Sequence, residues 1–252
     1  MALLIALALG FAACRTVPYT GRKQLSLIPS GQEAALGDDA YRQYLKESKI
    51  SADAQNTAMV RRVGERLARV AERPDFKWEF NLIEDKTPNA FCLPGGKVGI
   101  HTGILQYTQD EDGLAVVMGH EIAHAIASHG TERMSQGLLA QFGGVALAVA
   151  LSEKPSETQT LFTQAYGLGV GVGVLLPFSR KHESEADRIG LILMSKAGYD
   201  PRAAVGFWQR MGKAAASAQK PPEFLSTHPS DERRIADIEK HLPEALSHRP
   251  AP

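Results

Sequence analysis

The sequence predicts an α+β fold that is mainly helical and contains a small three-stranded sheet. Several segments repeat apolar residues at the spacing of amphipathic helices, whereas residues 75–101 carry the alternation and the turn residues of short strands. The chain has 252 residues, of which 44% are hydrophobic, and this is enough for one sizeable core. Lys and Arg total 28, as do Asp and Glu, so we expect no basic surface for a nucleic acid.

An uncharged apolar run, Ala2 to Ala13, ends directly before Cys14. Its twelve residues suit the core of a signal peptide and are too few to span a bilayer. Because small residues before a cysteine resemble a lipobox, we expect residues 1–14 to be a signal peptide and Cys14 to carry a lipid anchor. An ordinary signal peptide is the alternative, since Phe11 stands where leucine is usual. Both place the protein outside the cytoplasm, and we expect it in the cell envelope. In a Gram-negative organism Arg15, in place of Asp, favours a periplasmic lipoprotein of the outer membrane.

The rest of the chain divides into an arm and one domain. Residues 15–32 predict an extended arm because they are rich in Thr, Gly, Pro and Ser, and residues 33–252 predict a single domain. That domain opens with two predicted helices, 33–48 and 54–72. On the second helix, a basic cluster predicts a solvated face: Arg61, Arg62 and Arg66.

A short sheet is predicted after these helices. Within residues 75–83, aromatic and aliphatic side chains alternate with charged or polar ones, as in a half-buried strand. Two further short strands are predicted at 91–93 and 98–101, and the residues Pro94-Gly95-Gly96 form the turn between them.

The next predicted helix carries an H-E-x-x-H motif at His120, Glu121 and His124. Residues four apart lie one above the other on a helix, so both imidazoles reach one ion and Glu121 can touch a water beside it. Thr108 and Glu111 predict a capping box at the start of this helix. Apolar residues at helical spacing continue through the motif: Leu114, Val117, Met118, Ile122 and Ile126.

Two apolar, glycine-containing segments follow the motif, at 138–151 and 161–178, with a polar linker at 152–160. The first segment is too short to favour a transmembrane helix, and the second contains polar residues and several glycines. We therefore expect the first segment to be a buried or interfacial helix. We expect the second to pack in the core or to form a mobile lid beside the site, with contact to a membrane as the alternative.

A catalytic zinc site needs a third protein ligand. The third histidine of the metzincin pattern would stand six residues after His124, where the chain has Gly130, so that class is excluded. Glu183 and Asp187 are four residues apart and share one helix face, so one can bind metal while the other accepts the N–H of a ligand imidazole. Glu185 points away from this face and is expected to be solvated.

Several runs along the chain form a wider pattern: Thr20-Gly21-Arg22-Lys23-Gln24-Leu25, Asn89-Ala90-Phe91, Pro94-Gly95-Gly96, His120 to His124, Glu183-Ser184-Glu185-Ala186-Asp187, and Ser226-Thr227-His228-Pro229 followed by Arg234. The pattern covers residues 17 to 240 and resembles the HtpX and CAAX prenyl protease family of zinc metallopeptidases, in its soluble BepA-, LoiP- and Oma-like branch. The resemblance implies a minigluzincin-like core with one Zn²⁺ per chain. It assigns zinc to His120, His124 and Glu183, catalysis to Glu121, and leaves Asp187 as the residue that orients a ligand.

The resemblance also implies roles for residues outside the two helices. In such relatives the histidine matching His228 approaches the zinc and keeps the enzyme latent, so His228 is expected to be a switch or to stabilise the oxyanion. The alternative is a histidine at a helix start, with Pro229 in the first turn. Arg234 is expected to orient the site or to stabilise the oxyanion, or else to be a surface charge. Residues 97–100 are expected to form the edge strand that pairs with an extended substrate.

The sequence thus predicts a zinc-dependent endopeptidase that hydrolyses unfolded or misassembled envelope proteins, with a metal-activated water and Glu121 as general base. The alternative is a zinc-stabilised chaperone or assembly factor of the envelope with latent or minor proteolysis. Glu121 argues against complete loss of catalysis, because a structural zinc needs no base. A membrane-remodelling protein would use the two apolar segments but leaves the metal residues unexplained. The oligomeric state is not predicted.

Overall fold

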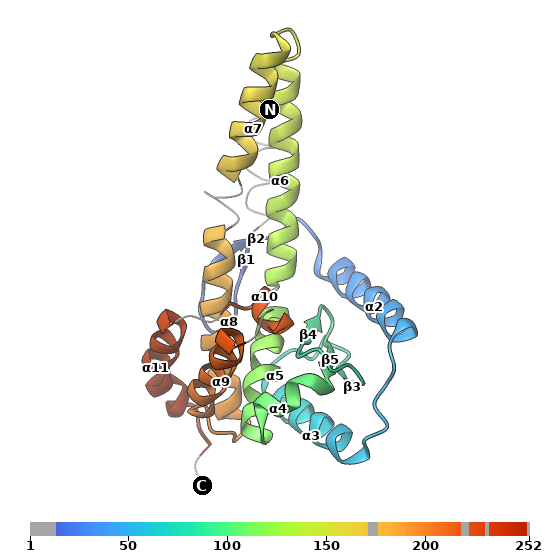
Figure 1. Ribbon diagram of the computed structural model, residues 1–252, viewed down its shortest axis with the longest axis vertical. Helices are drawn as coiled ribbons and strands as arrows, with labels where there is room; N and C mark the ends of the chain where they lie inside the picture. The colour runs from blue at the N-terminus through green and yellow to red at the C-terminus, as the bar shows by residue number, and fades with distance from the viewer. Residues whose placement is uncertain (1–13, 171–175, 218–221, 230–231, 251–252) are drawn as a thin grey trace. The chain divides into compact units, whose positions relative to one another are not determined.

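The computed structural model describes residues 14–170, 176–217, 222–229 and 232–250 (Figure 1). Apart from Cys14, the predicted signal peptide lies outside these residues. Contacts group the chain into two compact units, one formed by 1–29 with 128–182 and the other by 30–127 with 183–252. The predicted bounds of the arm and of the domain are not tested by this grouping and stay predictions.

The first unit combines a short strand pair with helices. Arg15 lies opposite Gln24 in the antiparallel pair, so the predicted arm is extended there, although the next helix already begins at Ser30. The elements of this unit are β1 (Cys14–Thr16), β2 (Lys23–Leu25), α6 (His129–Ala150), α7 (Ser156–Val170) and the first part of α8 (Leu176–Lys196).

A buried carboxylate, Glu132 on α6, connects the strand pair to two helices. Two nitrogens of the Arg22 guanidinium donate to its two oxygens, at 3.0 and 2.7 Å. His182 on α8 lies 2.8 Å from the same carboxylate and stacks on His129, with the ring centroids 4.3 Å apart. Burial opposes ionisation of Glu132, but His182 and Arg22 lower its pKa to about 2.

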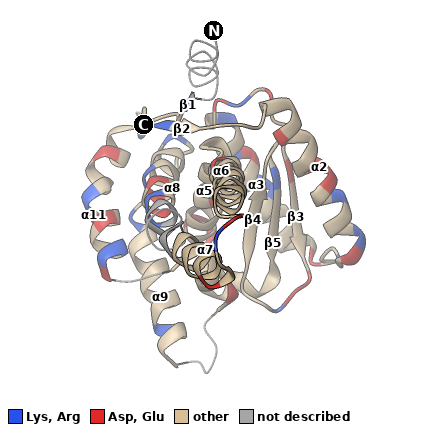
Figure 2. Cartoon of the chain, turned by 90° about the horizontal axis from the view of Figure 1, so that it is seen from above, with Lys and Arg blue, Asp and Glu red and all other residues tan. Residues whose placement is uncertain are grey.

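Apolar side chains of α6 and α7 are exposed, so the predicted burial is wrong for the described parts of the two apolar segments, 138–151 and 161–167. Phe142 and Val149 have 67% and 68% of their surface exposed. Figure 2 shows both helices mostly in the colour of uncharged residues. No described helix is long and apolar enough to cross a membrane. The other large apolar residues exposed on these helices are Met134, Leu138, Leu139, Val145, Leu161 and Phe162.

The second unit contains the motif helix, a mixed sheet and the C-terminal helices. Its α3 begins where Asp53 accepts a hydrogen bond from the backbone N–H of Asn56, close to the predicted start. Its helices are α2 (Ser30–Glu47), α3 (Ala54–Val70), α4 (Leu105–Thr108), α5 (Glu111–Ile126), the second part of α8, α9 (Ala203–Ser217), α10 (Glu223–Thr227) and α11 (Glu232–Ser247).

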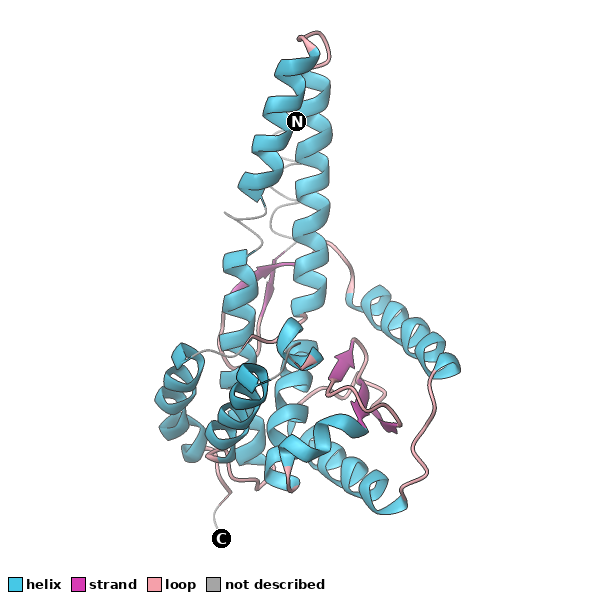
Figure 3. Ribbon diagram, in the orientation of Figure 1, coloured by secondary structure: helices cyan, strands magenta, loops and turns pink. Residues whose placement is uncertain are grey.

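The motif helix α5 packs against α3, α9 and the sheet (Figure 3). Almost every side chain along it is buried, which suits the apolar residues between the motif histidines. The predicted capping box is wrong. The cap is Asp110, which accepts from the backbone N–H of Gly113, whereas Thr108 ends α4 and donates to its own helix at Leu105.

The sheet has the three predicted strands: β3 (Glu79–Ile83), β4 (Ala90–Leu93) and β5 (Lys97–His101). Their order is β3-β5-β4, with β5 parallel to β3 and antiparallel to β4. Gly95 and Gly96 form the turn with φ of 84° and 86°, a conformation that other residues rarely adopt. The predicted edge strand over 97–100 is therefore wrong, because β5 lies in the centre and the edges are β3 and β4.

Candidate active site

Three segments of the second unit bring four predicted site residues together. Helix α5 supplies His120 and His124, one turn apart, and α8 supplies Glu183. His228 follows the last residue of α10. One ligand atom from each of these four residues lies within 4.8 Å of the others, so they could hold a metal ion.

The distances within this cluster fit a tetrahedral zinc ion. The Nε2 atoms of His120 and His124 face each other at 3.0 Å, and each lies 3.4 Å from an oxygen of Glu183. Two imidazole lone pairs at this distance repel each other unless a proton or a cation lies between them. Ligand atoms about 2.0–2.1 Å from a tetrahedral zinc are about 3.3 Å apart. The donor set, two imidazoles and a carboxylate, is also one that zinc prefers.

Asp187 orients the first of these ligands. The Nδ1 of His120 lies 2.9 Å from Oδ1 of Asp187, and since a carboxylate only accepts, Nδ1 carries a proton. In the neutral ring, the form that can bind a metal, the lone pair is therefore on Nε2. Arg234 donates from Nε and from its second terminal nitrogen to the two oxygens of Asp187, both at 2.8 Å. Arg234 is itself buried, so it is no surface charge.

Burial and close charges shift the pKa values of this site strongly. Burial disfavours the charged form of His120, but hydrogen bonds to Asp187 and Glu183 raise its pKa to about 9. Burial likewise disfavours the charged form of Glu183, yet its histidine neighbours hold its pKa well below the ordinary value. The pKa of Asp187 is also lowered, because the charge of Arg234 and the hydrogen bond to His120 outweigh burial.

Glu121 lies beside the cluster and is 4% exposed. Its Oε1 is 3.3 Å from Nε2 of His228 but makes no hydrogen bond within the described part of the chain. Burial raises its pKa, against the opposing effect of His228 and His120. A buried carboxylate oxygen without a hydrogen bond is rare and requires an explanation, and a water in the site would satisfy it.

His228 contacts both the metal-ligand cluster and Glu121. Its Nδ1 lies 3.1 Å from Nε2 of His120 and 2.9 Å from Oε2 of Glu183. His228 is the C-cap residue of α10, and Pro229 after it is not helical, so Pro229 does not lie in the first turn of a helix as the alternative interpretation required.

Two aromatic residues that the sequence did not single out form a wall of the site. Trp208 on α9 lies edge-on to His120, with centroids 6.0 Å apart, and stacks on Phe224 of α10 at 5.7 Å. The ring centroids of Phe224 and His228 are 4.7 Å apart, and the guanidinium carbon of Arg234 lies 3.5 Å from the centroid of the Trp208 ring. In the sequence these residues are indistinguishable from core residues, because their only signal is an apolar helix face.

The remaining acidic and histidine residues have structural surroundings. Glu185 was expected to be solvated, and this is wrong, since only 8% of it is exposed. His101 is buried on the central strand, and its Nε2 lies 2.7 Å from the hydroxyl of Tyr44. His129 and His182 belong to the cluster around Glu132.

Comparison with known proteins places this geometry in a family. The model of peptidase family M48 matches residues 54–242. The chain is 40% identical over 238 residues to the mitochondrial metalloendopeptidase OMA1 of Schizosaccharomyces pombe, covering 93% of this chain and 68% of that protein. It is 32% identical to human OMA1, covering 95% of this chain and 48% of that protein. It is 31% identical to the β-barrel assembly-enhancing protease of Escherichia coli, covering 88% of this chain and 46% of that protein. The chain belongs to peptidase family M48 and is a metalloendopeptidase of that family.

Proposed function

We propose that this metalloendopeptidase hydrolyses peptide bonds with one Zn²⁺ per chain, held by His120, His124 and Glu183. The observation that carries the proposal is Glu121, a buried carboxylate with an oxygen that lacks a hydrogen bond, beside a cluster of facing donor atoms. Burying a carboxylate oxygen without a hydrogen bond costs free energy. A metal site that served stability alone would not require this residue, whereas a hydrolytic site requires a base there.

Zinc bound by these residues supplies a Lewis acid that polarises the scissile carbonyl and lowers the pKa of an attacking water. Glu121 accepts the proton of that water and then delivers it to the leaving amine. The pKa of Glu121 is raised by burial, which suits a group that must both accept and release a proton near neutral pH. Asp187 keeps the proton of His120 on Nδ1 and thereby directs Nε2 toward the cluster.

We assign His228 to a latch and Arg234 to positioning. Catalytic zinc keeps one coordination position open for water. Nδ1 of His228 lies close to both His120 and Glu183, so His228 could bind the ion in place of that water. Withdrawal of His228 would open that position. Arg234 directs two nitrogens to Asp187 and a third to the backbone oxygen of Pro229, so its donors are engaged in holding the site together.

The proposed substrate class is supported by the edge of the sheet that packs against the motif helix. Strand β4 is an edge strand and packs against α5, so it replaces residues 97–100 as the strand proposed to pair with a substrate. Pairing through backbone groups selects extended chains over particular side chains. Unfolded or misassembled envelope proteins are therefore the proposed substrates.

A periplasmic location with a lipid anchor at Cys14 is part of this proposal. Cys14 is exposed, as a modified residue must be. The name of the Escherichia coli relative describes a protease that enhances β-barrel assembly, which agrees with an envelope role. The competing proposal, a zinc-stabilised chaperone or assembly factor with latent proteolysis, is supported by the proximity of His228 to the ligands.

Cleavage of unfolded casein by the zinc-loaded full chain tests the proposal. Glu121→Gln is expected to lower the rate by about a hundredfold or more, while zinc content stays at one ion per chain. His228→Ala is expected to cleave faster than the wild type, because the latch is gone. Glu239→Gln, an exposed carboxylate on α11, is the matched control and should leave the rate unchanged. Bound zinc without cleavage by either the wild type or His228→Ala would favour the chaperone.

A further inference from the structure

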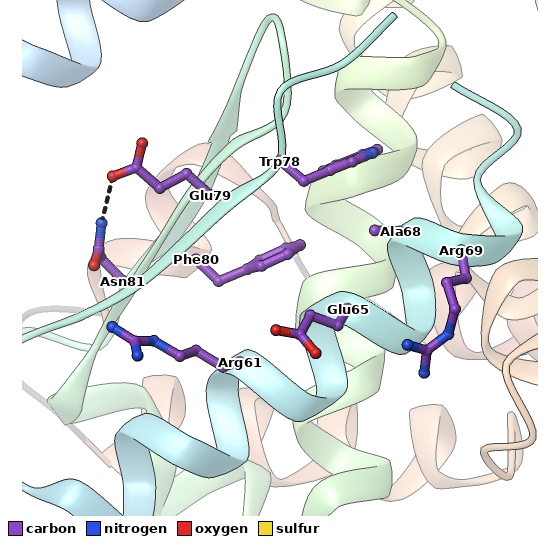
Figure 4. Close-up of a pocket in the computed structure, with 8 residues that line it drawn as sticks. All are labelled: Arg61, Glu65, Ala68, Arg69, Trp78, Glu79, Phe80 and Asn81. Atoms are coloured by element: carbon purple, nitrogen blue, oxygen red, sulfur yellow. Dashed lines mark hydrogen bonds between the residues drawn. The ribbon is translucent and has the colours of Figure 1, made fainter. Parts of the chain in front are cut away.

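A groove of about 590 Å³ lies between α3 and β3, at the sheet edge opposite β4 (Figure 4). Arg61, Glu65 and Arg69 line it from α3, and Trp78 and Phe80 line it from the strand side. The Trp78 and Phe80 rings stack parallel, with centroids 6.0 Å apart, and form an apolar wall. In Figure 4, Arg61 lies at the Asn81 end of the groove and Arg69 lies toward the Trp78 end.

The strand side of this groove is an open sheet edge. The N–H of Glu79 donates to Gly96 beside β5, and in a parallel pair the alternate residues, Phe80 and Leu82, direct their backbone groups outward. Leu82 already has an outside partner, because its carbonyl accepts from the N–H of Ser51. No hydrogen bond reaches the outward N–H or C=O of Phe80 within the described residues. The edge thus pairs with a strand-like segment at one end and is open at the other.

The helix side carries two arginines with one glutamate between them, so the three side chains have a net positive charge. Arg61, Glu65 and Arg69 are exposed and form one stripe on α3, four residues apart. No ion pair involves any of the three among the residues that the structure describes. Arg62, on another face, forms an ion pair with Glu111, so the arginines of α3 differ in whether they have a partner.

We propose that this groove binds an extended segment of a protein chain that adds to β3 as a further strand and carries two acidic side chains four residues apart. A peptide residue opposite Phe80 would direct its side chain to the same face of the sheet as the Phe80 ring. That ring packs on Gly64 of α3, so the peptide side chain would point at the charged stripe. Eight residues of helix rise about 12 Å between Arg61 and Arg69, and four residues of strand rise about 13 Å. The two acidic residues can therefore face the two arginines while the backbone pairs with β3.

The surface is independent of the proposed catalytic site, so binding is measured in the full-length Glu121→Gln variant, which is not expected to cleave the probe. The probe is a blocked, fluorescently labelled peptide, Thr-Glu-Val-Thr-Val-Glu-Thr, followed by anisotropy at low ionic strength. Arg61→Glu combined with Arg69→Glu is expected to weaken binding by about tenfold or more, because two attractions become repulsions. Replacing both peptide Glu residues with Gln is expected to weaken binding to the unchanged protein.

Two controls separate the groove from general effects. Lys213→Glu combined with Lys240→Glu makes the same charge change on exposed parts of α9 and α11 and is expected to leave the affinity within about twofold. N-methylation of the peptide nitrogens that face β3 should abolish binding, whereas N-methylation of the alternate nitrogens, which face away from β3, should not. Equal affinity of the wild-type groove and its double Arg→Glu variant, or equal loss in both registers, would overturn the proposal.

Discussion

Asp187 joins two residues that stand far apart in the sequence, His120 and Arg234. It accepts a hydrogen bond from the imidazole on one side and two from the guanidinium on the other. The buried charge of Asp187 is compensated by Arg234, whose planar fork matches the two carboxylate oxygens. One carboxylate therefore sets both the tautomer and the orientation of the imidazole that faces the metal-ligand cluster.

Asp187→Asn tests this role at the level of a single residue. The amide is a weaker acceptor for the His120 N–H and leaves Arg234 without a buried countercharge, so zinc affinity is expected to fall by about 10–100-fold. Competition with a chromogenic chelator measures the affinity directly. Asp237→Asn, an exposed residue of α11, is the control. Unchanged zinc affinity in Asp187→Asn would show that His120 needs no such partner.

At the scale of elements, the close packing of α3 on β3 depends on a glycine. A Cβ atom at Gly64 would lie 2.4 Å from Cδ1 of the Phe80 ring, well inside contact distance. Phe80 is buried and cannot turn into solvent without exposing its ring. The helix and the strand approach each other this closely only because residue 64 has no side chain.

Gly64→Ala is expected to lower the free energy of unfolding by about 1–3 kcal/mol, because overpacking outweighs the better helix propensity of alanine. Gly212→Ala on α9 is the matched control. A Cβ there meets nothing within 4 Å, so that change is expected to raise stability by up to about 1 kcal/mol. Urea unfolding followed by circular dichroism compares the two variants. A neutral Gly64→Ala would contradict the tight contact.

At the scale of the whole molecule, a cluster of charged side chains joins the elements of the first unit. The Arg22–Glu132–His182 cluster links the N-terminal strand pair to α6 and α8, although its members are far apart in the chain. Because Glu132 is more acidic in the folded state than its ordinary pKa of 4.5, the unfolded chain binds more protons between about pH 2 and 4.5. This contribution to stability is complete above that range and is lost as the pH falls through it.

Glu132→Gln is therefore expected to make stability less dependent on pH between about 2 and 4.5, while lowering it near neutral pH. Urea unfolding of the zinc-free wild type and variant at a series of pH values measures the difference, and the other carboxylates contribute equally to both. Glu157→Gln, exposed on α7, serves as the comparison. Parallel pH profiles for the wild type and Glu132→Gln would rule out a lowered pKa for Glu132.

Much of the candidate site was accessible from the sequence because helical spacing is a local property. His120 and His124 share a face at four residues apart in any helix, and so do Glu183 and Asp187. The sheet strands were likewise predicted from alternation and from Pro94-Gly95-Gly96. The predictions that were wrong concerned the neighbours of a residue. They were that Thr108 caps the motif helix, that residues 97–100 form an edge strand, and that Glu185 is solvated. Each depends on what packs beside a residue, which spacing does not specify.

The sequence by itself determined the candidate chemistry of this protein, a helix motif that could bind metal followed by an acidic pair, because those residues act through fixed local geometry. Only the tertiary structure decided which atoms meet. It directs Arg234 to Asp187, brings His228 against Glu183, and packs Trp208 on Arg234. These contacts join helices separated by many residues, and long-range packing of buried side chains, rather than any local preference, fixes them.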